Sequence, residues 1–146
     1  MNADDIAPRN ATYRSFVALG RAPTVAEVAS SLRIAASDAQ AGWEHLAADH
    51  ALVLDGDGAI RMANPFAASE TPYRVEAGGR SWFANCAWDS LGIGAALAVD
   101  STVHTTCPDC SEPLTIAVRE GRPDRSDLVF HVLVPAVSWW EDIGFT

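Results

Sequence analysis

The stretch S-W-F-A-N-C-A-W-D-S, residues 81–90, carries the most specific pattern in this 146-residue chain. It opens a run, residues 82–97, whose composition predicts a helix with Asn85 as a cap. Cys86 and Asp89 are three residues apart, so on a helix they share one face and can meet at one small site. The stretch therefore predicts a thiol and a carboxyl group side by side near a helix N-terminus.

This pairing suits a specific kind of chemistry. The helix dipole and the free N–H groups at a helix N-terminus predict a lowered pKa for Cys86. Trp82, Phe83 and Trp88 are expected to form an apolar pocket wall that excludes water and raises the pKa of Asp89. A thiolate beside a proton-carrying carboxyl group can bind a soft metal and move a proton next to it. The alternative is a buried helix cysteine with a solvated or capping aspartate.

Composition narrows the range of functions. The net charge is −9 and all ten basic residues are arginine, so nucleic acid is not an expected partner. No stretch approaches the roughly 18 to 20 apolar residues of a membrane span, and the N-terminus lacks the pattern of a secretory signal. Three cysteines do not make a disulfide framework. We expect a cytoplasmic protein with free thiols.

The first part of the chain predicts a helical lobe over residues 1–66. Its helices are expected at residues 8–20, 24–34 and 36–50, and a D-G-D-G turn predicts a β-hairpin within residues 51–62. Two capping-box patterns support the second and third helices, Thr24 with Glu27 and Ser37 with Gln40. Three helices followed by a hairpin is the order of a winged helix.

A winged helix can read DNA, but the third helix argues against that role here. It holds Asp38, Glu44 and Asp49 and has no lysine or arginine, which a recognition helix normally brings to phosphates and guanine edges. We therefore expect a structural lobe that covers a catalytic core. A winged-helix regulator that senses a metal through Cys86 is a less favoured alternative.

The second part, residues 67–146, predicts an α+β lobe of β-sheet and helix, which makes the whole chain an α+β protein. Besides the helix around Cys86, strands are expected at residues 71–77, 101–106, 114–120 and 127–135. Trp139 and Trp140 either close over the site or pack a final helical turn, and we favour packing.

A Cys-x-x-Cys turn, C-P-D-C-S-E-P, lies between two of these strands. Cys107 and Cys110 are half of a zinc-ribbon pattern, which needs two further ligands. The nearest histidines are His104 and His131, the latter on the last expected strand. The alternative is a hairpin turn with one buried cysteine.

The segments F-A-N-C-A-W-D-S-L, T-T-C-P-D-C and L-T-I-A-V together resemble alkylmercury lyase, the organomercurial lyase of bacterial mercury resistance. The resemblance implies a winged-helix-like module followed by a catalytic lobe, with no organic cofactor. It implies that Cys86 is the thiolate that attacks mercury in R–Hg⁺. Asp89 takes part in proton delivery to the leaving carbon and in holding the Hg(II) product. The cysteine at the position of Cys107 is structural in the family.

The sequence departs from the family at a second catalytic thiol, which the family carries near its C-terminal end. No cysteine follows Cys110 in this chain. We expect either a lyase that uses Cys86 and Asp89, acting on a small organomercurial and handing Hg(II) to a mercuric reductase, or a homologue without mercury activity. Such a homologue would use the Cys–Asp pocket for another small molecule or a soft metal. Cys107 and Cys110 are then candidates to receive Hg(II) as a dithiol.

Overall fold

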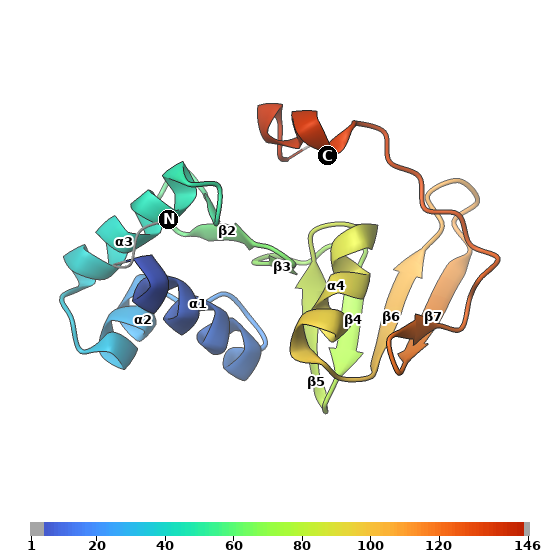
Figure 1. Cartoon of the computed structure of the whole chain (residues 1–146), viewed down its shortest axis with the longest axis horizontal. Helices are drawn as coiled ribbons and strands as arrows, with labels where there is room; N and C mark the ends of the chain where they lie inside the picture. Colours follow the sequence, from blue (N-terminus) through green and yellow to red (C-terminus); the bar gives the residue numbers. More distant parts are fainter. Residues whose placement is uncertain (1–4, 145–146) are drawn as a thin grey trace.

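The computed structural model describes residues 5–144, in which three N-terminal helices precede an antiparallel sheet and a fourth helix (Figure 1). The helices are α1 (Ile6–Leu19), α2 (Val25–Leu32), α3 (Ala36–Ala48) and α4 (Ala87–Leu97). The first three pack on one another, and α4 lies against strands β4 and β5 of the sheet. The predicted α+β class is confirmed.

The sheet has eight strands in the order β1-β2-β3-β5-β4-β6-β7-β8, and every pairing is antiparallel. The strands are β1 (Val53–Leu54), β2 (Ile60–Ala63), β3 (Phe66–Ala67), β4 (Arg74–Ala77), β5 (Arg80–Ala84), β6 (Ser101–Thr106), β7 (Pro113–Arg119) and β8 (Arg122–Pro123). Strand β3 pairs with both β2 and β5, so the hairpin after the helices continues into the main sheet. The division into lobes at residues 66 and 67 stays a prediction.

Of the two capping boxes predicted at the helix N-termini, one is present in the structure. The capping box of α2 is confirmed: the N–H of Glu27 donates to the Thr24 hydroxyl, and the Glu27 carboxylate accepts from the Thr24 N–H at 2.7 Å. The second predicted capping box is wrong, because α3 begins after Ala35 and contains Ser37. Gln40 instead donates its side-chain amide to the carbonyl of Gly58 in the hairpin turn.

One face of the central sheet is buried beneath α4. Val75 of β4, Trp82 of β5 and Val103 of β6 lie side by side in the register, and all three are buried. Ile93 of α4 is fully buried in the same core. Because side chains alternate along a strand, the neighbouring positions Arg74, Phe83 and His104 lie on the opposite face.

The same core joins the N-terminal helices to the sheet. Trp82 donates its indole N–H to the carbonyl of Phe16 in α1 at 3.0 Å. The rings of Phe16 and Phe66 stack with centroids 5.3 Å apart, and Phe66 meets Trp82 edge-on. This aromatic group fixes α1 against strand β3 and against strand β5, which leads to Cys86.

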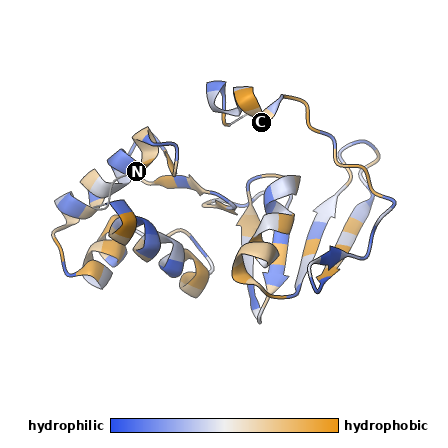
Figure 2. Ribbon diagram, in the orientation of Figure 1, coloured by the Kyte–Doolittle hydropathy of each residue, from blue (hydrophilic) through white to orange (hydrophobic). Residues whose placement is uncertain are grey.

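The predicted strand over residues 127–135 is wrong. After β8 the chain leaves the sheet, runs without regular structure and ends in a short 3₁₀ helix, η2 (Ala136–Glu141). Strand β8 pairs only with Val118 and Arg119 at the end of β7, and residues 127–135 do not extend this pairing along the rest of that edge. Figure 2 shows many apolar residues along it, and Val129 and Leu133 are largely exposed.

The two tryptophans of η2 make packing contacts, which is the alternative favoured for them from the sequence. Trp140 stacks on His50 at the end of α3, with ring centroids 4.1 Å apart, and Trp139 donates its indole N–H to the carbonyl of Val134. Within residues 5–144, no helix has both the length and the apolar character needed to cross a bilayer.

A buried hydrogen-bond chain in the helical lobe gives a test of the packing. The fully buried Trp43 donates its indole N–H to the Thr12 hydroxyl at 2.8 Å, which in turn donates to the carbonyl of Pro8. Thr12→Val keeps the shape but leaves the indole N–H unpaired, so we expect the free energy of unfolding to fall by about 1–3 kcal/mol. Chemical denaturation measures this change. Thr12→Ser keeps the hydroxyl, and an equal loss there would contradict the hydrogen-bond explanation.

Candidate active site

Cys86 occupies the N-cap position of helix α4, two residues after the end of strand β5. Its backbone is extended, with φ −150°, and its carbonyl accepts the first helical hydrogen bond from the Ser90 N–H at 3.0 Å. The helix expected from residue 82 therefore begins at Ala87, because residues 80–84 form a strand in the sheet core. The cysteine itself lies at a helix N-terminus, as the sequence predicts.

Asp89 lies in the first turn of α4, and the structure brings its carboxyl group to the Cys86 thiol. Both side chains are half-buried. A thiol can donate to a carboxylate, so the two groups share a proton-exchange path without an intervening residue. The spacing of three residues thus brings the two side chains together as expected for one helical turn.

Asn85 was expected to cap the helix, but it has another role in the structure. Its side-chain amide donates to the Asp89 carboxylate at 3.1 Å and to the side-chain oxygen of Asn64 at 3.0 Å. Asn64 lies in the connection between β2 and β3. The hydrogen bonds of this amide therefore orient the Asp89 carboxyl and link it to the connection before β3, the strand that pairs with β5. Asn64 could not be found from the sequence because it lies 21 residues before Asn85 and carries no motif.

The pKa of Cys86 is raised above the usual cysteine value, opposite to the direction expected from the helix end. Burial is the largest cause, and the negative charge of Asp89 adds to it. The backbone N–H groups of Asp89 and Trp88 favour the thiolate, as a helix N-terminus should, but they do not outweigh desolvation. Cys86 is therefore held as a thiol until something replaces its proton.

The pKa of Asp89 is also raised. Burial is the largest cause, and hydrogen bonds from Asn85 and Cys86 oppose it by favouring the charged form. The direction agrees with the expectation of a carboxyl group that retains a proton more readily than a surface aspartate.

The expected aromatic wall around Asp89 does not form from the three predicted residues. Trp82 and Phe83 are adjacent on strand β5, so they lie on opposite faces of the sheet, and Trp82 is committed to the core beside Phe16. Trp88 is 62% exposed and its ring lies 6.1 Å from Phe130 of the C-terminal segment. The wall was predicted from a helix at residues 82–88, which the structure replaces with a strand and a turn.

Two tyrosines lie near the pair and were missed by sequence reasoning. The pKa of Tyr73 is raised, first by burial and then by the charge of Cys86. The pKa of Tyr13 is raised by burial, with Arg9 lowering it and Asp89 raising it further. Tyr13 comes from α1, so the N-terminal helices contribute to the surroundings of the site. Neither tyrosine belongs to a motif that marks it as functional.

Cys107 and Cys110 lie in the turn between β6 and β7, apart from helix α4. The turn is closed by hydrogen bonds from the Ser111 N–H to the Cys107 carbonyl and from the Cys107 N–H to the Glu112 carbonyl, each 2.9 Å long. The pKa of Cys107 is lowered, first by the N–H of Cys110, then by the N–H of Asp109 and the Cys110 side chain. The Cys107 thiol is therefore more acidic than the Cys86 thiol.

The further ligands of a zinc ribbon are not assembled around this turn. His104 pairs with Glu76 at 3.5 Å, and His131 lies exposed on the irregular C-terminal segment. Across residues 5–144, no three His, Cys, Asp or Glu side chains come together as a metal site. A four-ligand zinc site built on Cys107 and Cys110 is therefore not formed by this part of the chain.

The opposing effects at Cys86 can be measured by removing the charge beside it. In a background with Cys107→Ser and Cys110→Ser, Asp89→Asn should lower the pKa of Cys86, because a neighbouring carboxylate disfavours the thiolate. The pH dependence of alkylation by iodoacetamide reports this pKa. Asp57→Asn, in the hairpin turn, makes the same charge change elsewhere and should leave the titration unchanged. An unchanged or higher midpoint in Asp89→Asn would show that the carboxyl does not act on the thiol.

The fold and this geometry can be compared with known proteins. The sequence profile of the alkylmercury lyase family matches residues 66–146, more than half of the chain. A solved structure described as the mercury-bound form of MerB2 is similar, with a TM-score of 0.65 and 25% sequence identity. The similarity covers 84% of this chain and 59% of that chain, so this protein spans about three fifths of that relative's length. Among curated proteins, none matches the chain. Since the family profile covers β3 through the C-terminal segment, including Cys86 and Asp89, the chain belongs to the alkylmercury lyase family.

Proposed function

We propose that the protein cleaves carbon–mercury bonds in small organomercurials, with Cys86 and Asp89 as its reacting groups. The observation that supports this most directly is the half-buried thiol–carboxyl pair at the start of α4, inside the segment that matches the family. A soft thiolate is the ligand that mercury prefers, and a carboxyl with a raised pKa holds a proton next to it.

The first step is capture of R–Hg⁺ by Cys86. The S–H bond of the thiol breaks, an S–Hg bond forms, and the proton passes to the Asp89 carboxylate. Burial and the Asp89 charge raise the pKa of Cys86, so the free thiolate is disfavoured, but binding of a cation at sulfur offsets both causes. Asp89 receives the proton at the position where Asn85 orients it.

The second step is protonolysis. The proton moves from the Asp89 carboxyl to the carbon bonded to mercury, and the electron pair of the C–Hg bond becomes the new C–H bond. The hydrocarbon R–H leaves, Hg(II) remains on the Cys86 sulfur, and Asp89 is ionised again and able to hold the metal. Mercury stays Hg(II) throughout, so the reaction needs no electron donor. Free thiol in the cytoplasm then removes Hg(II), which a mercuric reductase would consume.

The lyase reaction is tested by incubating the protein with phenylmercury and excess 2-mercaptoethanol and measuring benzene. Wild type should release benzene, and Cys86→Ser should reduce it to background because the soft ligand is lost. Asp89→Asn should slow release by roughly 10²–10⁴-fold, the usual contribution of a positioned proton donor. Cys110→Ser keeps Cys86 and should behave as wild type, since excess thiol removes the product.

The same assay separates cleavage from metal binding alone. If wild type releases no benzene but binds one equivalent of Hg(II) through Cys86, the lyase proposal is rejected and a soft-metal binder remains. The observation that favours this second function is that Cys86 is the one cysteine at the start of α4, while Cys107 and Cys110 lie in the turn between β6 and β7, so within residues 5–144 a second thiolate that would help to break the C–Hg bond is not beside it. If Cys86→Ser bound Hg(II) as tightly as wild type, the site assignment itself would be wrong.

We also propose that Cys107 and Cys110 can receive Hg(II) as a dithiol. Their side chains interact within one turn, and Cys107 has a lowered pKa, which favours the thiolate that binds soft metals. After one equivalent of Hg(II) is added to Cys86→Ser, both cysteines should be protected from alkylation, as seen by mass spectrometry. Full alkylation of both would sink the proposal. In the double variant Cys86→Ser with Cys110→Ser, a competing thiol should remove Hg(II) from Cys107, so Cys107 should become alkylated.

A further inference from the structure

A cleft of about 510 Å³ lies between helix α1 and the part of the sheet that carries α4. Its lining comes from α1, from the connection around β3, from the start of β5 and from the end of α4. Arg9, Arg14 and Arg80 line it, together with Tyr13 and Asn64. The cleft is thus built where the two halves of the chain meet.

The charge of this cleft is opposite to that of the whole protein. Three of the ten arginines line it, and no carboxylate does, although the chain has nineteen acidic residues and a net charge of −9. Three other clefts of similar size formed by the described residues each include at least one Asp or Glu. Arg9, Arg14 and Arg80 have no ion-pair partner among residues 5–144. Their positive charge is therefore free to act on a ligand.

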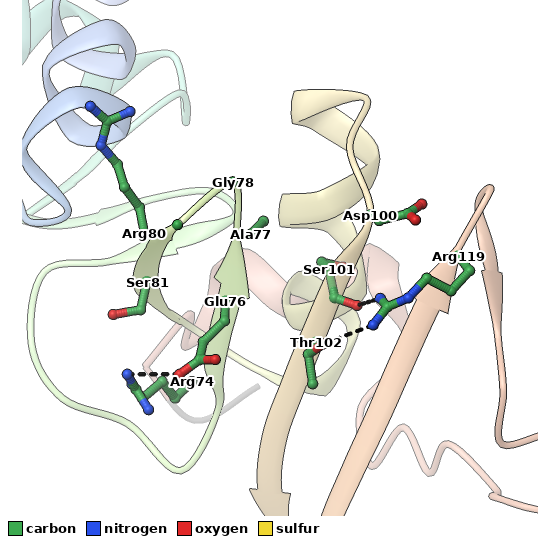
Figure 3. Close-up of a pocket in the computed structure, with 11 residues that line it drawn as sticks. Arg74, Glu76, Ala77, Gly78, Arg80, Ser81, Asp100, Ser101, Thr102 and Arg119 are labelled. Carbon is green, nitrogen blue, oxygen red and sulfur yellow. Dashed lines mark hydrogen bonds and ion pairs between the residues drawn. The ribbon is translucent and has the colours of Figure 1, made fainter.

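The arginines of the neighbouring cleft in Figure 3 provide a contrast. There Arg74 pairs with Glu76 at 2.9 Å, and Arg119 donates to the carbonyl of Ser101 at 2.7 Å. Arg80 also borders that cleft, but its side chain extends away from these groups toward helix α1 (Figure 3). Its guanidinium thus faces the region of the α1 cleft, where Arg14 lies.

The remaining lining of the α1 cleft is apolar. It consists of side chains that offer no hydrogen bond, among them Val17, Pro65, Phe66 and Leu97. Arg9 lies over the Tyr13 ring at 4.8 Å, which leaves its guanidinium edge available. Arginine binds carboxylates through charge-assisted, often bidentate hydrogen bonds, while an apolar lining binds a hydrocarbon body. We propose that the α1 cleft binds organic carboxylates with an apolar body.

The α1 cleft is connected to the Cys86–Asp89 pair. Asn64, part of its lining, accepts the hydrogen bond from the same Asn85 amide that holds Asp89. Tyr13, also part of the lining, donates its hydroxyl to the Asn64 carbonyl at 3.0 Å, and the Asp89 charge acts on its pKa. The α1 cleft is therefore linked to the Cys86–Asp89 pair by hydrogen bonds through Asn64 and Asn85.

Binding in the α1 cleft stands on its lining alone, whereas its use during cleavage rests on the proposed function. The bound carboxylate has two sources in that reaction. It can belong to the organic group on mercury, or to a carboxylate-bearing thiol that accompanies mercury. In either case a carboxylate binds to the arginines of the α1 cleft.

Binding is measured by NMR titration of the mercury-free protein with benzoate and with benzamide, its neutral counterpart. Wild type should bind benzoate, and Arg14→Gln with Arg80→Gln should weaken binding at least about tenfold, or 1.4 kcal/mol. Arg122→Gln removes one exposed arginine charge outside the α1 cleft and should change the dissociation constant by less than about twofold. The proposal is overturned if benzamide binds as tightly as benzoate, or if the double variant binds benzoate as wild type does.

The two sources are separated by hydrocarbon release from wild type and the double arginine variant. If the organic group supplies the carboxylate, the variant should be slow on 4-carboxyphenylmercury with 2-mercaptoethanol but normal on phenylmercury. If the thiol supplies it, the variant should be slow on phenylmercury only when mercaptoacetate replaces 2-mercaptoethanol. Equal rates in all arms would overturn the link to the reaction. If wild type binds benzoate but releases no hydrocarbon, the lyase function is rejected, while the proposal that the α1 cleft binds carboxylates still stands.

Discussion

The chain passes from strand β5 to helix α4 through only two residues, and this short connection sets the geometry of the site. Strand β5 is held in register by β3 on one side and β4 on the other, so the position of Cys86 is fixed by the sheet. The first turn of α4 then presents Asp89 to the thiol. Asn85 completes the connection by joining Asp89 to Asn64, which ties the turn to the β2–β3 connection. The placement of the Cys86–Asp89 pair therefore depends both on the pairing of β5 and on the side-chain hydrogen bonds of Asn85.

Two physical effects compete at this connection, and their relative size decides the state of Cys86. A helix N-terminus stabilises a thiolate through its N–H groups and dipole, an effect of typically 0.3–1 kcal/mol at an exposed site. Burial acts in the other direction and is the larger cause at Cys86, with the charge of Asp89 adding to it. A cysteine at a helix N-terminus is therefore not a thiolate by position alone. Cys107 shows the opposite balance, since the N–H groups of Cys110 and Asp109 lower its pKa by more than desolvation raises it.

The sequence predicted the fold class, the three N-terminal helices and the hairpin because these depend on local signals such as the Thr24 capping box and the D-G-D-G turn. It also predicted the meeting of Cys86 and Asp89, since one helical turn is enough to bring them together. It failed at residues 127–135, where strand propensity is present but the segment pairs with no strand of the sheet, because strand formation depends on tertiary context as well as on local propensity. It also misplaced Trp82, since the change from strand to helix within residues 80–87 reverses which side chains share a face. Contacts such as Asn64 with Asn85 are set by strand pairing across the sheet, and no local pattern encodes them.

The raised pKa values of Cys86 and Asp89 have a common consequence for reactivity. Burial raises the pKa of both groups, and the charge of Asp89 further disfavours the Cys86 thiolate, so the pair retains a proton in preference to ionising twice. In the proposed reaction, a bound mercury cation supplies positive charge at sulfur, and the proton can then leave without building up negative charge. Asp89 accepts that proton in the proposed reaction and passes it to the carbon bonded to mercury. The same burial that keeps the thiol protonated in the free protein thus disfavours the bare thiolate, whereas a soft cation bound at sulfur neutralises the thiolate charge.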